Sequence, residues 1–168
     1  MSQEHPRPRR TGRLETRPDA QHLVLERSFR APIQDVWAAV TDPDRLARWI
    51  GTWTGDPASG AVVFEMTAES APPQPCRITV CEPPTRLGLE LMEPDGAAPW
   101  TLTVVLTAHG GTTTLTFDQA LGPSAPVRDV GPGWEYYLDR LVAAETGGDV
   151  AAITWDAYVP MGEEYLDS

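Results

Sequence analysis

The 168 residues carry a formal net charge of −11 at pH 7, and 41% of them are hydrophobic, which is enough for one domain with a substantial core. Because so acidic a chain repels phosphate backbones, we expect no nucleic-acid partner. No stretch holds the roughly 18 apolar residues of a membrane span, and no apolar segment follows Met1 as in a secretory signal, so we expect a cytoplasmic protein.

The first 21 residues differ from the rest of the chain in charge. They hold five Arg against three acidic residues, a balance of +2, so the remainder carries −13. Few apolar residues interrupt them, which is typical of a disordered tail. We therefore expect residues 1–21 to be disordered and the removal of residues 1–20 to leave the fold intact; contact with an anionic surface is the alternative.

The first strand is predicted over residues 22–30, with Arg27 as the one charge on its inward apolar face. Apolar residues at i, i+3, i+4 and i+7 from Ile33 then predict a helix. Asp42 and Pro43 form a second start signal, an acidic N-cap followed by proline. We therefore expect two short helices directly after the first strand.

A loop over residues 51–60 is expected to carry Trp53. Beyond it, the alternation of apolar and polar residues predicts an antiparallel sheet with one covered face. The predicted strands cover residues 61–67, 75–82, 86–92, 100–109 and 112–121. Cys76 and Cys81 lie near the two ends of one strand, and their odd spacing places them on opposite faces, so we expect two reduced thiols that do not bridge one another.

A long amphipathic helix is predicted over residues 132–146, with Gly147 and Gly148 as its stop signal. A helix of this length spans about 22 Å, enough to cross a sheet. The aromatic segment 147–168 is expected to pack back on the domain formed by residues 22–146. The apolar faces predict one shared core, made of Leu25, Phe29, Val36, Trp37, Phe64, Ile78, Leu89, Val104, Leu115, Phe117 and Leu138.

Three motifs carry a resemblance to known proteins. They are Arg27-x-Phe29-x-Ala31-Pro32, Thr41-Asp42-Pro43-x-x-Leu46-x-x-Trp49 and Gly133-Trp134-x-x-x-Leu138. These segments are similar to those of the SRPBCC superfamily of START/Bet v 1-like helix-grip proteins, and within it to the bacterial branch that resembles the C-terminal domain of the activator of Hsp90 ATPase. The resemblance covers residues 22–146. It implies an α+β fold with two short helices after the first strand and a curved antiparallel sheet wrapped around a long C-terminal helix, often with a cavity between them.

No motif in the sequence points to a specific chemistry. It lacks Gly-x-Ser-x-Gly, His-Glu-x-x-His, a Walker loop and Cys-x-x-Cys. Its three His and two Cys are scattered without the spacing of metal ligands. We therefore expect neither a metal nor a cofactor, and we nominate no catalytic residue.

The candidate ligand-binding residues are those that the helix-grip resemblance and inward parity direct to the cavity. They are Arg27, Trp49, Trp53, Phe64, Leu89, Leu102, Trp134, Tyr137 and Leu141. Arg27 either binds a ligand carboxylate or pairs with an internal acid such as Glu90 or Asp118, because a buried guanidinium needs a partner. Tyr137 either presents its hydroxyl to the cavity or packs as an ordinary aromatic residue on the helix flank.

Three functions remain open. The leading hypothesis is a protein that holds a hydrophobic or amphipathic small molecule between the sheet and the C-terminal helix. The alternative is a cyclase- or dehydratase-like enzyme of the same superfamily, in which Arg27 and Tyr137 polarise a carbonyl and shuttle a proton. The third is an acidic interaction module for a chaperone or regulator. A monomer or a homodimer is compatible with each.

Overall fold

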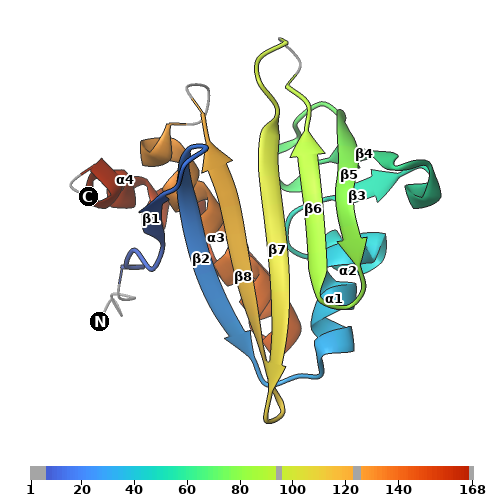
Figure 1. Ribbon diagram of the computed structural model, residues 1–168. Coiled ribbons are helices and arrows are strands. Elements are labelled where there is room, and N and C mark those ends of the chain that lie inside the picture. Colours follow the sequence, from blue (N-terminus) through green and yellow to red (C-terminus); the bar gives the residue numbers. More distant parts are fainter. Residues whose placement is uncertain (1–6, 94–95, 123–125, 167–168) are drawn as a thin grey trace.

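The computed structural model describes residues 7–93, 96–122 and 126–166, and one antiparallel sheet of eight strands dominates it (Figure 1). The strands are β1 (Arg13–Thr16), β2 (Gln21–Phe29), β3 (Thr52–Thr54), β4 (Ala61–Glu65), β5 (Gln74–Glu82), β6 (Arg86–Leu91), β7 (Trp100–His109) and β8 (Thr112–Leu121). Their order across the sheet is β1-β2-β8-β7-β6-β5-β4-β3. The curved sheet and the long helix near the end of the chain confirm the expected α+β helix-grip fold.

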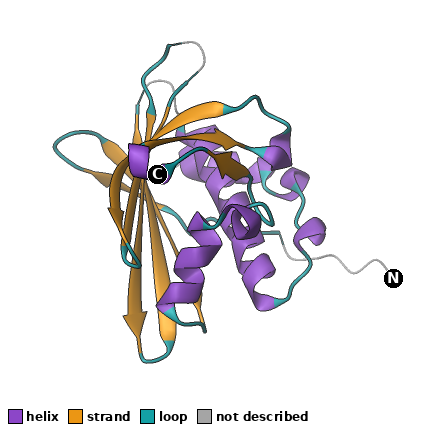
Figure 2. Cartoon of the chain, turned by 90° about the vertical axis from the view of Figure 1, so that its right-hand side faces the viewer, coloured by secondary structure: helices purple, strands orange, loops and turns teal. Residues whose placement is uncertain are grey.

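The helices gather on one side of the curved sheet (Figure 2). They are α1 (Ile33–Thr41), α2 (Pro43–Leu46), α3 (Val127–Thr146) and α4 (Gly162–Leu166), with short 3-10 turns η1 (Pro57–Ser59), η2 (Thr67–Glu69), η3 (Val150–Ala152), η4 (Trp155–Ala157) and η5 (Val159–Met161). The two short helices follow β2 as expected. Asp42 caps α2 by accepting the backbone N–H groups of Asp44 and Arg45, which leaves fewer orphan donors at the helix start.

Two strands form where the sequence pattern predicted none. The described part of residues 1–21 is ordered, because Arg13–Thr16 forms β1 and pairs with β2; residues 1–6 lie outside the described residues. Trp53 lies in β3 opposite Phe64, and not in a loop. Both strands are short and lie at the two edges of the sheet, and alternation over three or four residues is too brief to distinguish from a loop.

Helix α3 starts five residues earlier than expected, at Val127 and not at Pro132. Proline suits a first helical position, which explains the error. Inside the helix, Pro132 cannot donate to the carbonyl of Arg128, so that helical hydrogen bond is missing. The C-terminal segment packs closely against this part of α3, because a Cβ added to Gly131 would lie 2.6 Å from the ring of Tyr165.

The core lies between the sheet and α3. Six of the eleven predicted core residues are buried: Leu25, Phe29, Val36, Leu115, Phe117 and Leu138. The other five, Trp37, Phe64, Ile78, Leu89 and Val104, are half-buried. Four of these five line one cavity, so their partial exposure follows from the shape of the interior and not from an error of strand register.

Candidate ligand-binding cavity

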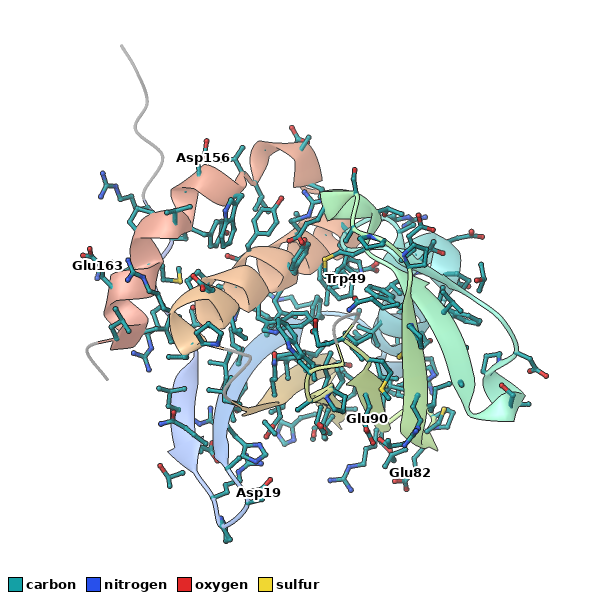
Figure 3. The ribbon with its side chains drawn as sticks, turned by 90° about the horizontal axis from the view of Figure 1, so that it is seen from above. Asp19, Trp49, Glu82, Glu90, Asp156 and Glu163 are labelled. Carbon is teal, nitrogen blue, oxygen red and sulfur yellow. The ribbon has the colours of Figure 1, made fainter. Side chains whose placement is uncertain are left out.

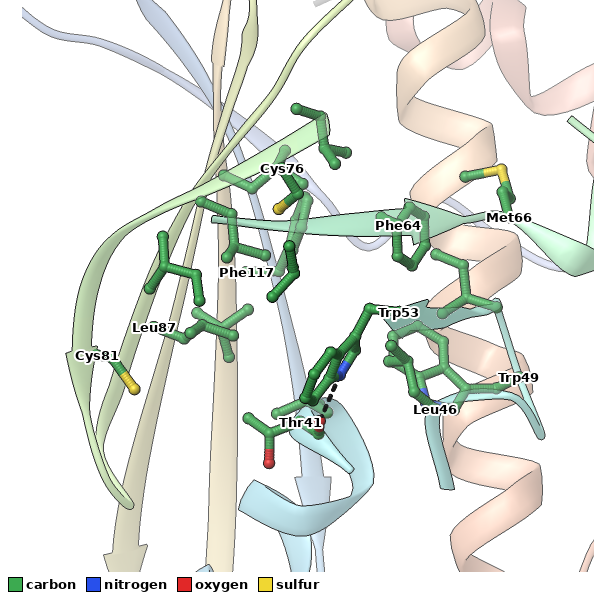
Figure 4. Close-up of a pocket in the computed structure, with 18 of the residues that line it drawn as sticks. Thr41, Leu46, Trp49, Trp53, Phe64, Met66, Cys76, Cys81, Leu87 and Phe117 are labelled. Carbon is green, nitrogen blue, oxygen red and sulfur yellow. Dashed lines mark hydrogen bonds between the residues drawn. The ribbon is translucent and has the colours of Figure 1, made fainter. Parts of the chain in front are cut away.

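A cavity of about 200 Å³ lies between the sheet and the helices (Figure 4). Strands β4 to β8 form one wall, while α1, α2, α3 and the segment after α2 form the other. Five aromatic side chains face it, from Trp49, Trp53, Phe64, Phe117 and Trp134. Among the described residues, its lining includes no Asp, Glu, His, Lys or Arg. The space is therefore an apolar cavity rather than an assembly of acids and bases.

An irregularity in β5 brings two thiols to the same wall. The pairing of β5 with β6 shifts between Ile78 and Val80, as at a β-bulge, and an extra residue reverses the alternation beyond it. Cys76 before the shift and Cys81 after it consequently both line the cavity (Figure 4). The prediction that they lie on opposite faces is wrong for this reason.

The two thiols differ in their surroundings. Cys76 is buried, and burial raises the pKa of its thiol to about 11, so it stays protonated and uncharged at neutral pH. Cys81 is exposed although it lines the cavity. Solvent therefore reaches this wall at Cys81.

The polar hydrogens of the other lining side chains already have protein acceptors. The indole N–H groups bond as follows: Trp49 to the Ala39 carbonyl at 3.0 Å, Trp53 to the Thr41 carbonyl at 2.8 Å, and Trp134 to Gln119 Oε1 at 2.6 Å. The hydroxyl of Thr41 donates to the Trp37 carbonyl at 2.7 Å. These bonds fix the orientation of the rings and leave the thiols as the remaining side-chain donors of the described lining.

The nine candidate residues divide into two groups. Six line the cavity: Trp49, Trp53, Phe64, Leu89, Leu102 and Trp134. Arg27, Tyr137 and Leu141 do not, and Leu141 is fully buried in the core. Inward parity on β6 and β7 was sufficient to find Leu89 and Leu102, whereas Cys81 was missed because a bulge leaves no clear signal in the sequence.

Arg27 pairs with acids of α3 and not with Glu90 or Asp118. Its guanidinium lies 3.0 Å from Glu135 and 3.1 Å from Asp139, which are one turn apart. Glu90 points to the outer side of the sheet (Figure 3). Asp118 instead accepts from His22 at 2.6 Å, on the face of β8 opposite Phe117. Arg27 therefore pairs with internal acids, which is one of the two predicted alternatives. Its partners, however, lie on α3, where this helix crosses β2.

Glu135 is the centre of this buried charged cluster. Its side chain is 1% exposed. It accepts the backbone N–H of Thr11 at 2.6 Å, the hydroxyl of Thr11, and the hydroxyl of Tyr165 at 3.2 Å, besides Arg27. The cluster joins the N-terminal segment, β2, α3 and α4, and it lies outside the cavity lining.

Tyr137 also points away from the cavity. Its hydroxyl donates to Glu69 Oε1 at 2.5 Å and to the sulfur of Met66 at 3.5 Å. Burial, reinforced by the hydrogen bond to Glu69, raises the pKa of Tyr137, so the phenol stays protonated. Because Met66 lines the cavity, the phenol of Tyr137 lies behind the Met66 side chain and does not itself line the cavity.

The part of the chain that the structure describes contains neither a metal-binding cluster nor a membrane-spanning helix. No three His, Cys, Asp or Glu side chains come together there as a metal site requires. Over the same residues, no helix combines the length and the apolar character needed to cross a membrane.

Solved structures with the same fold include proteins from several bacteria. CalU16 from Micromonospora echinospora has a TM-score of 0.74 and 27% identity, and the match covers 94% of this chain and 95% of that chain. BPP1335 from Bordetella parapertussis has a TM-score of 0.70 and 26% identity, with coverage of 98% and 94%. DynU16, a protein in the dynemicin biosynthetic locus, has a TM-score of 0.64 and 26% identity, with coverage of 77% and 49%.

The comparison with curated proteins gave no significant match. The comparison with protein families gave one, to the Activator of Hsp90 ATPase homolog 1-like proteins, over residues 30–145. That range includes the strand-to-helix junction after β2, the walls of the cavity and nearly all of α3. Since it is more than half of the sequence, the chain belongs to the family of Activator of Hsp90 ATPase homolog 1-like proteins.

Proposed function

We propose that this protein binds a small apolar molecule in the cavity between the sheet and the helices. The observation that carries the proposal is the cavity itself, about 200 Å³ of space bounded by apolar side chains. Space left unfilled between apolar side chains forfeits packing contacts and so reduces stability. A fold that keeps so costly a space at its centre has a use for it, and ligand binding is the use that an apolar lining serves.

The volume restricts the size of the ligand. An apolar cavity of about 150 Å³ holds benzene, and pockets for drug-sized molecules begin at about 300 Å³. The present cavity of about 200 Å³ lies between these limits. A compact ligand of roughly two fused rings fits the space, provided that the half-buried side chains at the exposed side move little.

The solved relatives support small-molecule chemistry as the class of function. DynU16 is described as a protein in the dynemicin biosynthetic locus. A member of the same fold in a biosynthetic locus supports either a ligand-binding or a cyclase-like role. The cyclase hypothesis required Arg27 and Tyr137 to face one space, whereas Arg27 is held by Glu135 and Tyr137 by Glu69. The geometry therefore favours ligand binding.

A cavity-filling substitution tests the proposal. Val104 lines the cavity, and its neighbour Val105 lies on the opposite face of β7. We expect Val104→Trp to weaken the binding of the neutral two-ring fluorescent probe 1-naphthylamine by at least about tenfold, because the added indole occupies the site. Val105→Trp is the matched control and should bind the probe as the wild type does. Equal affinity of the wild type and Val104→Trp would show that the probe binds elsewhere.

A further inference from the structure

We infer that the cavity accepts uncharged ligands and rejects anions, so that its natural ligand is a neutral molecule and not a carboxylate or phosphate. This inference rests on the proposed function and narrows the ligand class. The distinguishing property of the ligand is its charge, which separates neutral ring compounds and esters from fatty acids and other amphipathic acids of similar size.

The first observation is that the described lining of the cavity offers no cation to an anionic ligand. Three arginines on β2, α2 and α3 are engaged with protein groups: Arg27 with Glu135 and Asp139, Arg45 with Glu145 at 2.5 Å, and Arg140 with the Trp49 carbonyl at 2.9 Å. None of them belongs to the described lining of the cavity. A ligand carboxylate in this space would have no counter-ion.

The second observation concerns hydrogen-bond donors. The three indole N–H groups and the Thr41 hydroxyl of the described wall are each bonded to a protein acceptor. The thiols of Cys76 and Cys81 are only weak donors. A carboxylate that left water would exchange several strong hydrogen bonds for none of comparable strength, which is strongly unfavourable.

The third observation is the charge of the whole chain. A net charge of −11 at pH 7 produces a negative potential that lowers the local concentration of anions. The effect weakens as the salt concentration rises, whereas the lack of partners inside the cavity does not depend on salt. Together these features exclude anions at both the approach and the binding step.

The test compares methyl 2-naphthoate with 2-naphthoate, which share one ring system and differ in charge. Both compete with bound 1-naphthylamine at pH 7.5. We expect the ester to bind at least about 30-fold more tightly than the anion, because burial of an unpaired charge is costly. Affinities within threefold of one another would overturn the inference. Failure of the probe itself to bind would instead refute the proposed function, so the two failures are distinguishable.

A second measurement uses pH. If only the neutral form of the acid binds, its apparent affinity should rise about tenfold for each pH unit of acidification above its own pKa. Between pH 7.5 and 6.0 we therefore expect a gain of roughly 30-fold for the acid and no change for the ester. A flat profile for the acid would show that the anion binds, which contradicts the inference.

An introduced cation should reduce the preference of the cavity for the ester. Ile78 lines the cavity and is half-buried, so an arginine there can keep part of its guanidinium near solvent. We expect Ile78→Arg to shift the ester-to-acid ratio of affinities towards the acid by at least about tenfold, while the neutral control Ile78→Met leaves the ratio unchanged. The wild-type ratio and its pH profile decide the question if Ile78→Arg does not fold.

Discussion

Trp134 connects the cavity to the core of the protein. Its ring centroid lies 4.3 Å from that of Phe117, and both rings line the cavity. Its indole N–H donates to Gln119, a fully buried amide on β8. One side chain therefore packs the sheet against α3, satisfies a buried polar group and forms part of the ligand wall. Loss of it should affect stability and not binding alone.

We expect Trp134→Ala to lower the free energy of unfolding by about 3–5 kcal/mol, because the substitution enlarges a cavity and leaves Gln119 without its partner. Urea denaturation monitored by circular dichroism measures this loss. Trp155→Ala is the matched control: Trp155 is 43% exposed, so its removal should cost no more than about 1 kcal/mol. Equal losses for the two variants would contradict this division of roles.

Among the elements, β1 and α4 hold α3 in place over β2. Thr11, just before β1, donates twice to Glu135 of α3. Tyr165 of α4 donates to the same carboxylate, and its ring lies against Gly131. A buried carboxylate that loses a donor keeps its desolvation penalty. The N-terminal segment is therefore part of the helix packing, and we expect its removal to affect stability, whereas the sequence alone predicted that residues 1–20 are dispensable.

Removal of residues 1–16 should destabilise the protein. It deletes β1 and the two hydrogen bonds from Thr11 to Glu135, for which we expect a loss of at least about 2 kcal/mol and a fall in melting temperature of roughly 5 °C. The single variant Thr11→Val removes only the hydroxyl and should give a smaller loss of the same sign. A truncated protein that melts at the wild-type temperature would show that this segment contributes nothing to the packing of α3.

The sequence predicts features that depend on neighbouring residues better than features that depend on contacts between distant parts of the chain. Local signals located the two helices after β2 and the break between the strands predicted over residues 100–109 and 112–121, where Gly110 and Gly111 both have positive φ. Strand parity found cavity residues such as Leu89. The partners of Arg27 were beyond such signals, because they depend on how α3 crosses β2. The shared wall of Cys76 and Cys81 depends on a bulge, which alternation alone cannot locate.

The whole molecule is divided into two halves with different interiors. The segment before β1 and helix α4 lie on the same side of the molecule (Figure 1), where Arg10 donates to the Glu164 carbonyl at 2.7 Å. That half contains the Arg27–Glu135 cluster, which lies outside the cavity lining that the structure describes. The cavity lies in the other half, between strands β4 to β8 and the helices α1, α2 and α3. A buried charged cluster thus holds one half together, whereas the described lining of the cavity in the other half contains no charged side chain.

Ionisation also stabilises the β1–β2 hairpin through His22. Burial alone would lower the pKa of His22, but hydrogen bonds to Asp118 at 2.6 Å and Asp19 at 3.0 Å raise it overall, against a smaller opposing effect of Arg17. A group whose pKa is raised on folding stabilises the native state below its unfolded pKa, about 6.5 for histidine. The stabilisation is lost as the pH rises through the folded pKa.

We therefore expect the stability difference between the wild type and His22→Gln to be larger at pH 6.0 than at pH 8.5. Glutamine keeps a hydrogen-bonding side chain but cannot become charged. The substitution should therefore remove only the pH-dependent part of the stabilisation that His22 provides. Urea denaturation at the two pH values gives the difference, with His109→Gln at the exposed end of β7 as the control. A difference that stayed constant or grew towards pH 8.5 would mean that protonated His22 does not stabilise the hairpin. The wild-type stability would then have to depend on pH through other groups.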